Sequence, residues 1–254
     1  MPRHRGKFDI NRVEPYELSR SRIENFINCP ACFYMQQVEG IEFPSIPGFN
    51  INEATDILLK KDFDKFRGTS DTHPFLKSQG LNHLIPFYHE HFELWTQSLH
   101  FGAENRMNYD HLETNIRVGG GLDDIWKNTK TNKLHIVDYK STSQKKDKGP
   151  ITLDDKWKST YKRQMDLYTW IMRKKKFEID DIGYFLYCDG NRFSNKDFLY
   201  SKNAIMEFKI TLIPYITNTS WIEDTLSQIY SVLREQKRPK HSLECEYGKF
   251  LSII

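Results

Sequence analysis

The stretch LHIVDYKST, residues 134–142, constrains the fold of this chain more than any other. Its apolar first half predicts a buried β-strand, because aliphatic and β-branched residues favour pleated, buried positions. Asp138 and Lys140 follow with no turn residue between them, and both share a strand face with the apolar Ile136, since side chains alternate between faces. Either the chain leaves the core at this point, or the core contains partners for two charges.

The residues before this strand predict a β-hairpin with a polar turn at 130–131. If the hairpin closes symmetrically, Asp124 lies opposite Val137, and Asp123 lies opposite Asp138. Directly paired strand residues have Cβ atoms about 4.5–5.5 Å apart, and two carboxylates at that distance repel each other. A cation between Asp123 and Asp138 would remove the repulsion.

Mg²⁺ suits such a pair, because it prefers oxygen ligands and commonly uses one or two carboxylates together with phosphate oxygens. Lys140, one strand period beyond Asp138, would lie beside a metal-bound water or the phosphate that it attacks. This pattern predicts metal-assisted hydrolysis of a phosphodiester, in which metal and lysine stabilise the charge that grows on the phosphate. The alternative is that Asp138 and Lys140 form an ion pair at the strand end with no chemical role.

The bulk composition fits one globular domain. A chain of 254 residues with 38% hydrophobic residues can bury one sizeable core and is too apolar for disorder. No apolar run approaches the roughly 18 residues that span a bilayer, and the basic start lacks an apolar signal region, so we expect a cytoplasmic protein with no membrane partner. Lysines and arginines cluster at 145–148 and 173–176, which suits a polyanion or simply a solvated surface.

Periodicity predicts further elements along the chain. Helices are expected from Ser19 or Ser21 to Pro30, from Asn52, over 83–99, from Thr160 to Lys175 and from Ser220 to Gln236, and strands over 115–128, 182–188 and 204–216. The region 83–99 carries His83, His89 and His91, but we expect no metal site there, because residues two apart cannot share a helix face.

The four cysteines are too few for a disulfide framework. The C-P-A-C spacing of Cys29 and Cys32 raises a metal or cluster site as one possibility. Buried cysteines that act as small hydrophobic residues are the other, and we favour it.

Three segments together resemble a known family. GGLDDIW, LHIVDYKST and YKRQMDLYTWIM look like the G-x-x-D, D-x-K and Q-x-x-x-Y series of the PD-(D/E)xK nuclease superfamily, in its RecB-like branch, which includes CRISPR-associated exonucleases and the nuclease domains of recombination helicases. LSRSRIENFINCPACFYM is similar to the opening helix of that branch, and NEATDILLKKDF lies where its G-x-x-x-H-x-x-L helix belongs. The resemblance involves about a third of the residues between positions 19 and 172, and as a set it is specific.

The resemblance implies roles for individual residues. Asp123 and Asp138 resemble the metal-binding acids, and Lys140 resembles the catalytic lysine. The main-chain carbonyl of Tyr139 would be a further metal ligand.

A second group would contact DNA. Gln164, implied as a catalytic residue, and Tyr168 share a helix face and resemble the pair that orients the lysine and contacts the DNA backbone. Plain helix packing is the alternative for both, and we expect a mixed role for Tyr168. Lys145, Lys146 and Lys148, together with the basic residues at 173–176, would supply phosphate contacts that do not depend on sequence.

Asp56 departs from the family pattern, because the branch usually has histidine there. Its carboxylate could still ligate Mg²⁺ or Mn²⁺ through oxygen, so we include it among the expected metal ligands. The alternative is an acid that stabilises the start of a helix.

Some relatives bind an iron–sulfur cluster through one N-terminal and three C-terminal cysteines, commonly four thiolates in all. Cys29 fits that pattern and Cys245 could fit, but Gly248 stands where a further cysteine belongs. Cys32 and Cys188 could substitute only if the fold brought them in. We therefore expect no iron–sulfur ligands and no such cluster.

These expectations combine into one prediction. The fold would be α/β with a restriction-endonuclease-like core: a mixed central sheet of four or five strands flanked by helices, with the N-terminal and 83–99 helices as a cover beside the cleft. We expect a single nuclease domain over 1–254, in which 1–110 is mainly helical, 111–215 holds the catalytic sheet and helix, and 216–254 forms a C-terminal helix and tail.

The predicted activity is Mg²⁺- or Mn²⁺-dependent hydrolysis of DNA, by an exonuclease rather than a site-specific endonuclease. The expected partner is DNA. Because no ATP-motor motif is found, the protein either degrades DNA unaided or works with a separate helicase or recombination protein, and composition does not choose between these alternatives. One alternative is a catalytically silent nucleic-acid-binding subunit of a recombination or repair complex, against which the retained acids and lysine argue. Another is an enzyme that acts on a phosphate compound other than DNA.

Overall fold

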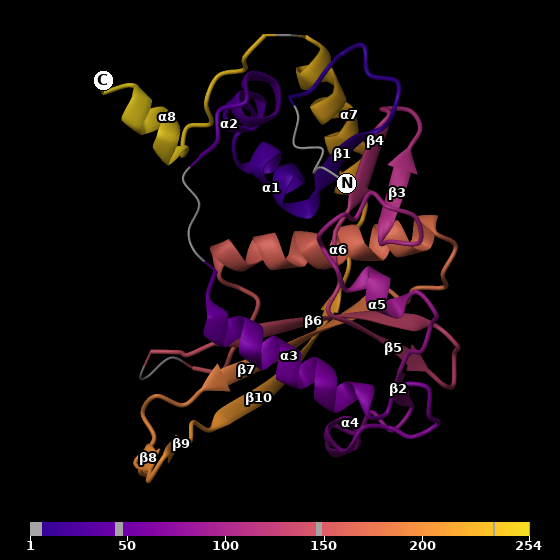
Figure 1. Ribbon diagram of the computed structural model, residues 1–254, viewed down its shortest axis with the longest axis vertical. Helices are drawn as coiled ribbons and strands as arrows, with labels where there is room; N and C mark the ends of the chain where they lie inside the picture. The colour runs from indigo at the N-terminus through magenta and orange to yellow at the C-terminus, as the bar shows by residue number, and fades with distance from the viewer. Residues whose placement is uncertain (1–6, 44–47, 146–148, 236, 254) are drawn as a thin grey trace.

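A five-stranded mixed sheet forms the centre of the protein (Figure 1). The computed structural model describes residues 7–43, 48–145, 149–235 and 237–253. The strand order is β10-β7-β6-β5-β2, with bounds Phe208–Ile216, Ile182–Gly190, Leu134–Thr142, Asp124–Asn128 and Leu84–Pro86. Strand β6 runs parallel to β7, and the other neighbours are antiparallel. The predicted mixed sheet of four or five strands flanked by helices is confirmed.

The predicted hairpin has the predicted register. Strands β5 and β6 pair antiparallel with Asp124 opposite Val137. The connection from β6 to the parallel β7 contains the long helix α6, Ser159–Lys174, since parallel neighbours need a crossover rather than a tight turn.

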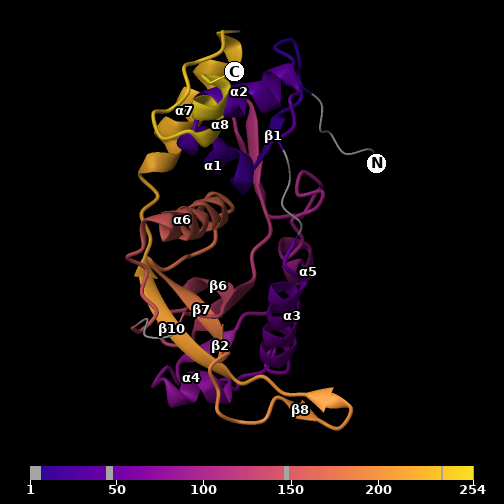
Figure 2. The same ribbon diagram turned by 90° about the vertical axis from the view of Figure 1, so that its left-hand side faces the viewer.

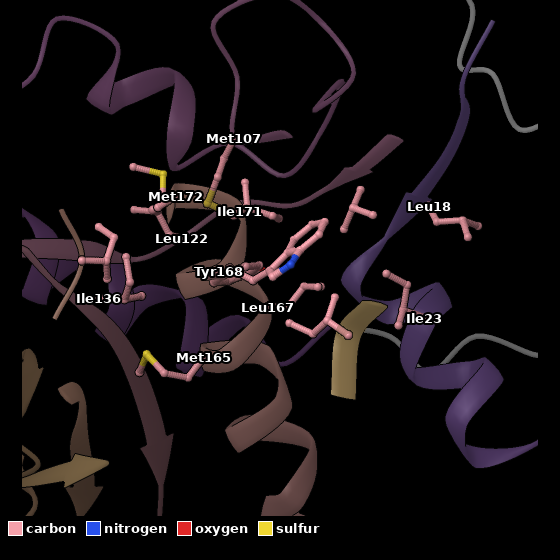
Figure 3. Packing of buried hydrophobic residues seen from close by; sticks show 14 of the residues in the cluster. Leu18, Ile23, Met107, Leu122, Ile136, Met165, Leu167, Tyr168, Ile171 and Met172 are labelled. Carbon is pink, nitrogen blue, oxygen red and sulfur yellow. The ribbon is translucent and has the colours of Figure 1, made fainter. Parts of the chain in front are cut away.

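Side chains of β6 alternate between two hydrophobic clusters. Ile136 packs in the larger cluster with Met165 and Ile171 of α6, as Figure 3 shows. Val137 packs in the smaller cluster on the other face, together with Phe63 of helix α3. Helices α6 and α3 (Asn50–Asp64) therefore cover opposite faces of the sheet.

A second, three-stranded sheet was not predicted. It consists of β1 (Tyr16–Ser19), β4 (Ile116–Gly119) and β3 (Asn108–His111), with β1 parallel and β3 antiparallel to the central β4. The single strand predicted over 115–128 is therefore wrong: glycines at 119–121 break it into β4 and β5, which belong to different sheets.

The helix predicted over 83–99 is also wrong, so it forms no part of a helical cover. Residues 84–86 form the edge strand β2, and only the short helix α5, Phe92–Trp95, follows. Pro86 explains the difference, because proline interrupts a helix and disfavours the helical conformation of the residue before it, whereas an edge strand tolerates it. His89 stacks on Trp95 with ring centroids 4.4 Å apart, and its Nδ1 accepts a hydrogen bond from the backbone N–H of His91.

Helices α1 (Arg20–Asn28) and α7 (Trp221–Arg234) lie close to their predicted bounds. The other helical segments were not predicted: α2 (Pro30–Tyr34), a π-helical turn (Met35–Glu39), α4 (Pro74–Ser78), a 3₁₀ turn (Lys156–Lys158) and α8 (Glu246–Leu251). Strand β10 begins four residues later than predicted, and the small hairpin of β8 (Leu199–Tyr200) and β9 (Asn203–Ala204) precedes it. Helices α1, α2, α7 and α8 gather at one end of the molecule, with α6 between them and the five-stranded sheet (Figures 1 and 2).

Candidate active site

Strand β6 carries the first two candidate residues, Asp138 and Lys140. Asp138 is only 2% exposed, and its Oδ2 forms an ion pair with the Lys140 ammonium group. Lys140 Nζ also donates to the backbone carbonyl of Tyr139 at 3.2 Å and lies 4.8 Å from the ring centre of Tyr161. The ion pair considered as an alternative is thus present, but it is buried within a larger group of charges.

Asp123, the residue before β5, places its carboxylate beside Asp138. Its Oδ2 accepts a hydrogen bond of 2.9 Å from the backbone N–H of Tyr139, and its Oδ1 lies 3.5 Å from Nζ of Lys60. The ladder itself ends at Asp124 and Val137, so the Asp123 side chain meets β6 beside Asp138 rather than in a regular pair. The two carboxylates are neighbours, as predicted.

The electrostatics of Asp138 reflect this crowding. Burial raises the pKa of its carboxyl, the charge of Asp123 raises it further, and Lys140 opposes both, so that the pKa is about 6 instead of 3.8. A buried acid with a pKa near 6 is poised to exchange its proton for another cation near neutral pH.

Helix α3 brings a third acid, Asp56. The helix lies against β6 through a hydrogen bond between the Thr55 and Ser141 hydroxyls, and the Ser141 hydroxyl donates to Asp56 Oδ1 at 3.5 Å. Burial and the charge of Asp123 raise the pKa of Asp56 to about 6. Lys60, one helical turn further on, pairs with Asp123 and had no signal in the sequence, because its partner lies 63 positions away in the chain.

Helix α6 holds Asp138 from the other side. Gln164 Nε2 donates to Asp138 Oδ1 at 2.8 Å, and the side chain is buried. The resemblance implied that Gln164 orients the lysine; in the structure it fixes the carboxylate with which Lys140 pairs. Tyr168, one turn later, packs in the larger hydrophobic cluster, and burial raises the pKa of its hydroxyl to about 12.

Glycines explain how the chain approaches Asp123. A Cβ atom on Gly120 would lie 2.8 Å from the ring of Tyr168, and one on Gly121 would lie 2.6 Å from the backbone nitrogen of Ser98. The glycine of the G-x-x-D pattern, Gly120, is therefore required by the tyrosine of the Q-x-x-x-Y pattern.

Asp124, next to Asp123, has a different environment. It is fully buried on the opposite face, where its Oδ1 pairs with the Arg67 guanidinium at 2.8 Å. Its Oδ2 accepts hydrogen bonds from Trp126 Nε1 and the Tyr139 hydroxyl at 3.0 and 2.7 Å. All its acceptor sites face protein donors, so this acid stabilises the fold.

Two cavities open beside the carboxyl end of β6. One, of about 280 Å³, is lined among others by Asn52, Thr55 and Ser141, next to Asp56. The other, of about 320 Å³, includes Lys145, Trp157 and Arg192. Lys145 is exposed, whereas the predicted DNA contacts Lys146 and Lys148 lie outside the described residues.

The second basic cluster lies elsewhere. Arg173 pairs with Asp181 at 2.6 Å, and Lys174 pairs with Glu223 at 2.8 Å, both at the far end of α6 from the acids. Positions 173–174 are therefore engaged in ion pairs within the protein, contrary to the prediction that they offer free phosphate contacts.

Three of the four cysteines lie together. Cys29, Cys32 and Cys245 surround His241, whereas Cys188 lies in β7. Three thiols and one imidazole do not provide the four thiolates that iron–sulfur clusters commonly need. Cys29 and Cys32 are buried in a small apolar cluster against which Cys245 packs, in line with the interpretation we favoured, and His241 beside them was not predicted.

Comparison with protein families gives a match over most of the chain. A family model described as the PD-(D/E)XK nuclease superfamily matches residues 72–250, a range that includes Asp123, Asp138, Lys140 and Gln164. No curated protein matches the chain. The mixed sheet with helices on both faces agrees with the restriction-endonuclease-like core that was predicted. In the part of the chain that the structure describes, no helix is long and apolar enough to cross a membrane.

Proposed function

The chain belongs to the PD-(D/E)XK nuclease superfamily, and on this basis we propose that it is a Mg²⁺- or Mn²⁺-dependent deoxyribonuclease with its active site around Asp138 and Lys140. We place it in the RecB-like branch, because the N-terminal and central motifs both occur in order. We further propose that it cleaves DNA from an end, as an exonuclease.

The convergence of three carboxylates from three elements carries this proposal. Asp56 comes from α3, Asp123 precedes β5 and Asp138 lies in β6. Burial raises the pKa of both Asp56 and Asp138, and the charge of Asp123 raises them further. Lys60 and Lys140 oppose these effects but leave both pKa values raised, so a further cation among the oxygens would be favourable. Carboxylates and a backbone carbonyl, here that of Tyr139, are the donors that Mg²⁺ and Mn²⁺ prefer.

When bound, a divalent cation would neutralise phosphate charge and lower the pKa of its water ligand. The chain's own residues would hold the remaining parts in place. Gln164 fixes Asp138 through its 2.8 Å hydrogen bond, and the backbone N–H of Tyr139 fixes Asp123 in the same way. Both acids are thereby oriented before substrate arrives, which lowers the reorganisation that catalysis requires.

Lys140 would act as a cation rather than as a base. Burial tends to lower the pKa of its ammonium group, but the charges of Asp138 and Asp123 outweigh burial and raise it. The lysine therefore stays protonated at neutral pH, where it can stabilise negative charge on the phosphate or orient the attacking water through an N–H donor.

The cavities beside β6 suggest the path of the substrate. The exposed Lys145 and Arg192 would contact phosphates, and Trp157, 56% exposed at the same cavity, could stack on a base. Such contacts do not read sequence, so binding should weaken strongly with added salt. Lys146, Lys148, Gln164 and Tyr168 remain proposed DNA contacts.

The test combines substrates, metals and variants. Linear and closed-circular DNA, single- and double-stranded, would be incubated with Mg²⁺, Mn²⁺ or EDTA. Wild-type protein should degrade linear DNA with metal and leave closed circles intact, whereas Asp138→Asn and Lys140→Met should be inactive. Asp224→Asn, an exposed acid of α7, serves as the matched control and should behave as wild type.

Each outcome selects among the alternatives. Nicked circles would show an endonuclease, and the exonuclease proposal would be lost. DNA binding with no cleavage under any metal would favour the silent nucleic-acid-binding subunit. Cleavage that persists in both active-site variants would contradict the placement of the active site.

A further inference from the structure

We propose that the protein holds a structural Zn²⁺ ion, separate from the candidate active site, through Cys29, Cys32, His241 and Cys245. One ligand atom from each of these residues lies within 4.8 Å of every other. The ion would fasten the C-terminal segment of the chain to its N-terminal helices.

The four residues come from opposite ends of the chain. Cys29 separates α1 from α2, and Cys32 lies in the first turn of α2. His241 and Cys245 directly precede α8, which lies beside α2 in both views (Figures 1 and 2). The spacings C-x₂-C and H-x₃-C are those of structural zinc sites, in which a short segment supplies each pair of ligands.

The distances around His241 fit a metal better than hydrogen bonds. Its Nδ1 lies 3.5 Å from the sulfur of Cys29, 3.7 Å from that of Cys32 and 3.6 Å from that of Cys245. One imidazole nitrogen has one lone pair and can accept one S–H bond, so three nearly equal contacts need another explanation. With Zn–S near 2.3 Å and Zn–N near 2.0–2.1 Å, a tetrahedral ion places the nitrogen about 3.5 Å from each sulfur.

The sulfur atoms have surroundings suited to thiolates. The sulfurs of Cys32 and Cys245 are 3.4 Å apart and are not bonded to each other. The backbone N–H of Ser242 points to the sulfur of Cys29 at 3.4 Å, and that of Gly248 points to the sulfur of Cys245 at 3.3 Å. Such donors stabilise thiolates and orient them as ligands, whereas neutral thiols gain little from them.

The C-terminal helix needs a fastening of this kind. Helix α8 buries no residue, so apolar burial does not account for its position. Among the described residues, the contacts at this end of the chain include the rings of Phe43 and Tyr247 and an exposed ion pair between Lys156 and Glu244 just before the helix. Cys245, the N-cap of α8, also packs against Cys29 and Cys32. Exposed ion pairs contribute little, so a metal bond would be the dominant attachment.

The donor set also selects the metal. Thiolates with one imidazole are a known ligand combination for zinc, while iron–sulfur clusters commonly use four thiolates, and Mg²⁺ avoids sulfur. The oxygen ligands around Asp138 have the opposite preference. The two sites, with α6 between them, would therefore take different metals (Figure 1).

Elemental analysis of the full-length protein, purified under reducing conditions without added metal, tests the proposal directly. We expect one zinc ion per chain that survives desalting and is released by a mercurial thiol reagent. Cys32→Ser and His241→Ala should lose the zinc, and Cys188→Ala, a buried cysteine outside the cluster, should retain it.

A second measurement does not depend on the variants. Cobalt exchanged into the wild-type protein should show thiolate-to-metal charge transfer and the intense visible bands of tetrahedral Co²⁺. Limited proteolysis should cut the C-terminal segment faster after zinc removal, and added zinc should reverse the change.

Three results would overturn the proposal. The first is a metal-free protein whose cysteines all react as free thiols. The second is a disulfide between Cys32 and Cys245. The third is bound iron and sulfide with an absorbance band at roughly 400 nm. If the variants fail to fold, metal content and the cobalt spectrum of the wild type decide alone. None of these readouts depends on DNA cleavage, so the zinc site and the proposed nuclease can fail independently.

Discussion

Adjacent acids of the same type, Asp123 and Asp124, should respond to the same substitution in opposite ways. Each would be changed to asparagine, which keeps the shape of the side chain and removes its charge. Asp124 is fully buried against Arg67, whereas Asp123 faces Asp138 and Asp56. We expect Asp124→Asn to lose stability and Asp123→Asn to lose activity.

The magnitude for Asp124→Asn follows from its ion pair with Arg67. The guanidinium is only 9% exposed, and removing one partner of a buried pair costs about 3–5 kcal/mol, because the remaining charge stays buried. Arg67 keeps a second partner in Asp64 at 2.7 Å, which favours the lower end of that range. For a domain of this size, each kcal/mol lowers Tm by about 2–4 °C, so a loss near 3 kcal/mol lowers Tm by roughly 6–12 °C.

Asp123→Asn should have little effect on stability and a large effect on activity. The asparagine carbonyl can still accept the hydrogen bond from the backbone N–H of Tyr139, and the substitution removes the repulsion that raises the pKa of Asp138 and Asp56. Lys60 loses a partner at 3.5 Å, which is a weak contact. Stability should change by less than about 1 kcal/mol. Cleavage should fall by more than the roughly 10–100-fold that loss of a residue supporting a metal ligand costs.

The assay measures both quantities on the same preparations. Thermal unfolding gives Tm in EDTA, and cleavage of labelled linear DNA is measured well below the lower Tm, so that every variant is folded. If Asp124→Asn abolishes cleavage while its Tm is unchanged, or Asp123→Asn retains wild-type activity, the division between the two faces of the sheet is wrong.

Three further predictions concern the same site. Gly120→Ala should destabilise the protein by about 1–3 kcal/mol, because the new methyl group meets the Tyr168 ring at 2.8 Å. In a double-mutant cycle, the same substitution should cost less in the Tyr168→Leu protein, and equal costs in both proteins would contradict the contact. Lys140→Arg should retain more activity than Lys140→Met while both bind Mn²⁺, since charge rather than proton transfer is required; equal losses in cleavage assays would refute this. Burial raises the pKa of Asp138 and of Asp56 to about 6 in the folded, metal-free protein, so these acids bind protons more tightly there than in the unfolded chain. The metal-free protein therefore gains stability as pH falls from 7 through 6 toward 4. Mn²⁺ must displace these protons, so the increase in Tm that it causes should be larger at pH 7.5 than at pH 5.5, and an equal increase at both would show that these acids do not bind it.

Local periodicity was enough to predict the centre of the site. The alternation along β6 placed Asp138 and Lys140 on one face, and the symmetric hairpin gave the observed pairing of Asp124 with Val137. Both inferences depend only on residues within about 20 positions of one another. The spacing of Gln164 within α6 was likewise local, although its partner, Asp138, required the crossover between parallel strands.

The contacts that could not be predicted all join distant segments. Arg67 reaches Asp124, and Lys60 reaches Asp123, because α3 and the turn after it fold over the sheet, and nothing in the sequence near either pair indicates this. His241 joins Cys29 and Cys32 across more than 200 residues, and it occurs in a tail with no periodicity. The break at 119–121 and the strand at 84–86 did have local signals, a run of glycines and Pro86, but we gave more weight to the apolar periodicity around them.

Helix α3 shows how a metal could contribute to structure as well as chemistry. Phe63 anchors one end by stacking on Trp126, with ring centroids 5.2 Å apart, but Thr55 is the only other residue of the helix that is buried. The half that carries Asp56 is therefore held mainly by polar contacts, and in the metal-free protein repulsion between Asp56 and Asp123 opposes those contacts. A cation shared by these acids would turn the repulsion into attraction and fix the helix on β6. Apolar burial is weak both here and at α8, so a metal would meet the same physical need at each of the two proposed sites: oxygen ligands around Asp138 would hold a hard cation, and sulfur with nitrogen around His241 would hold zinc.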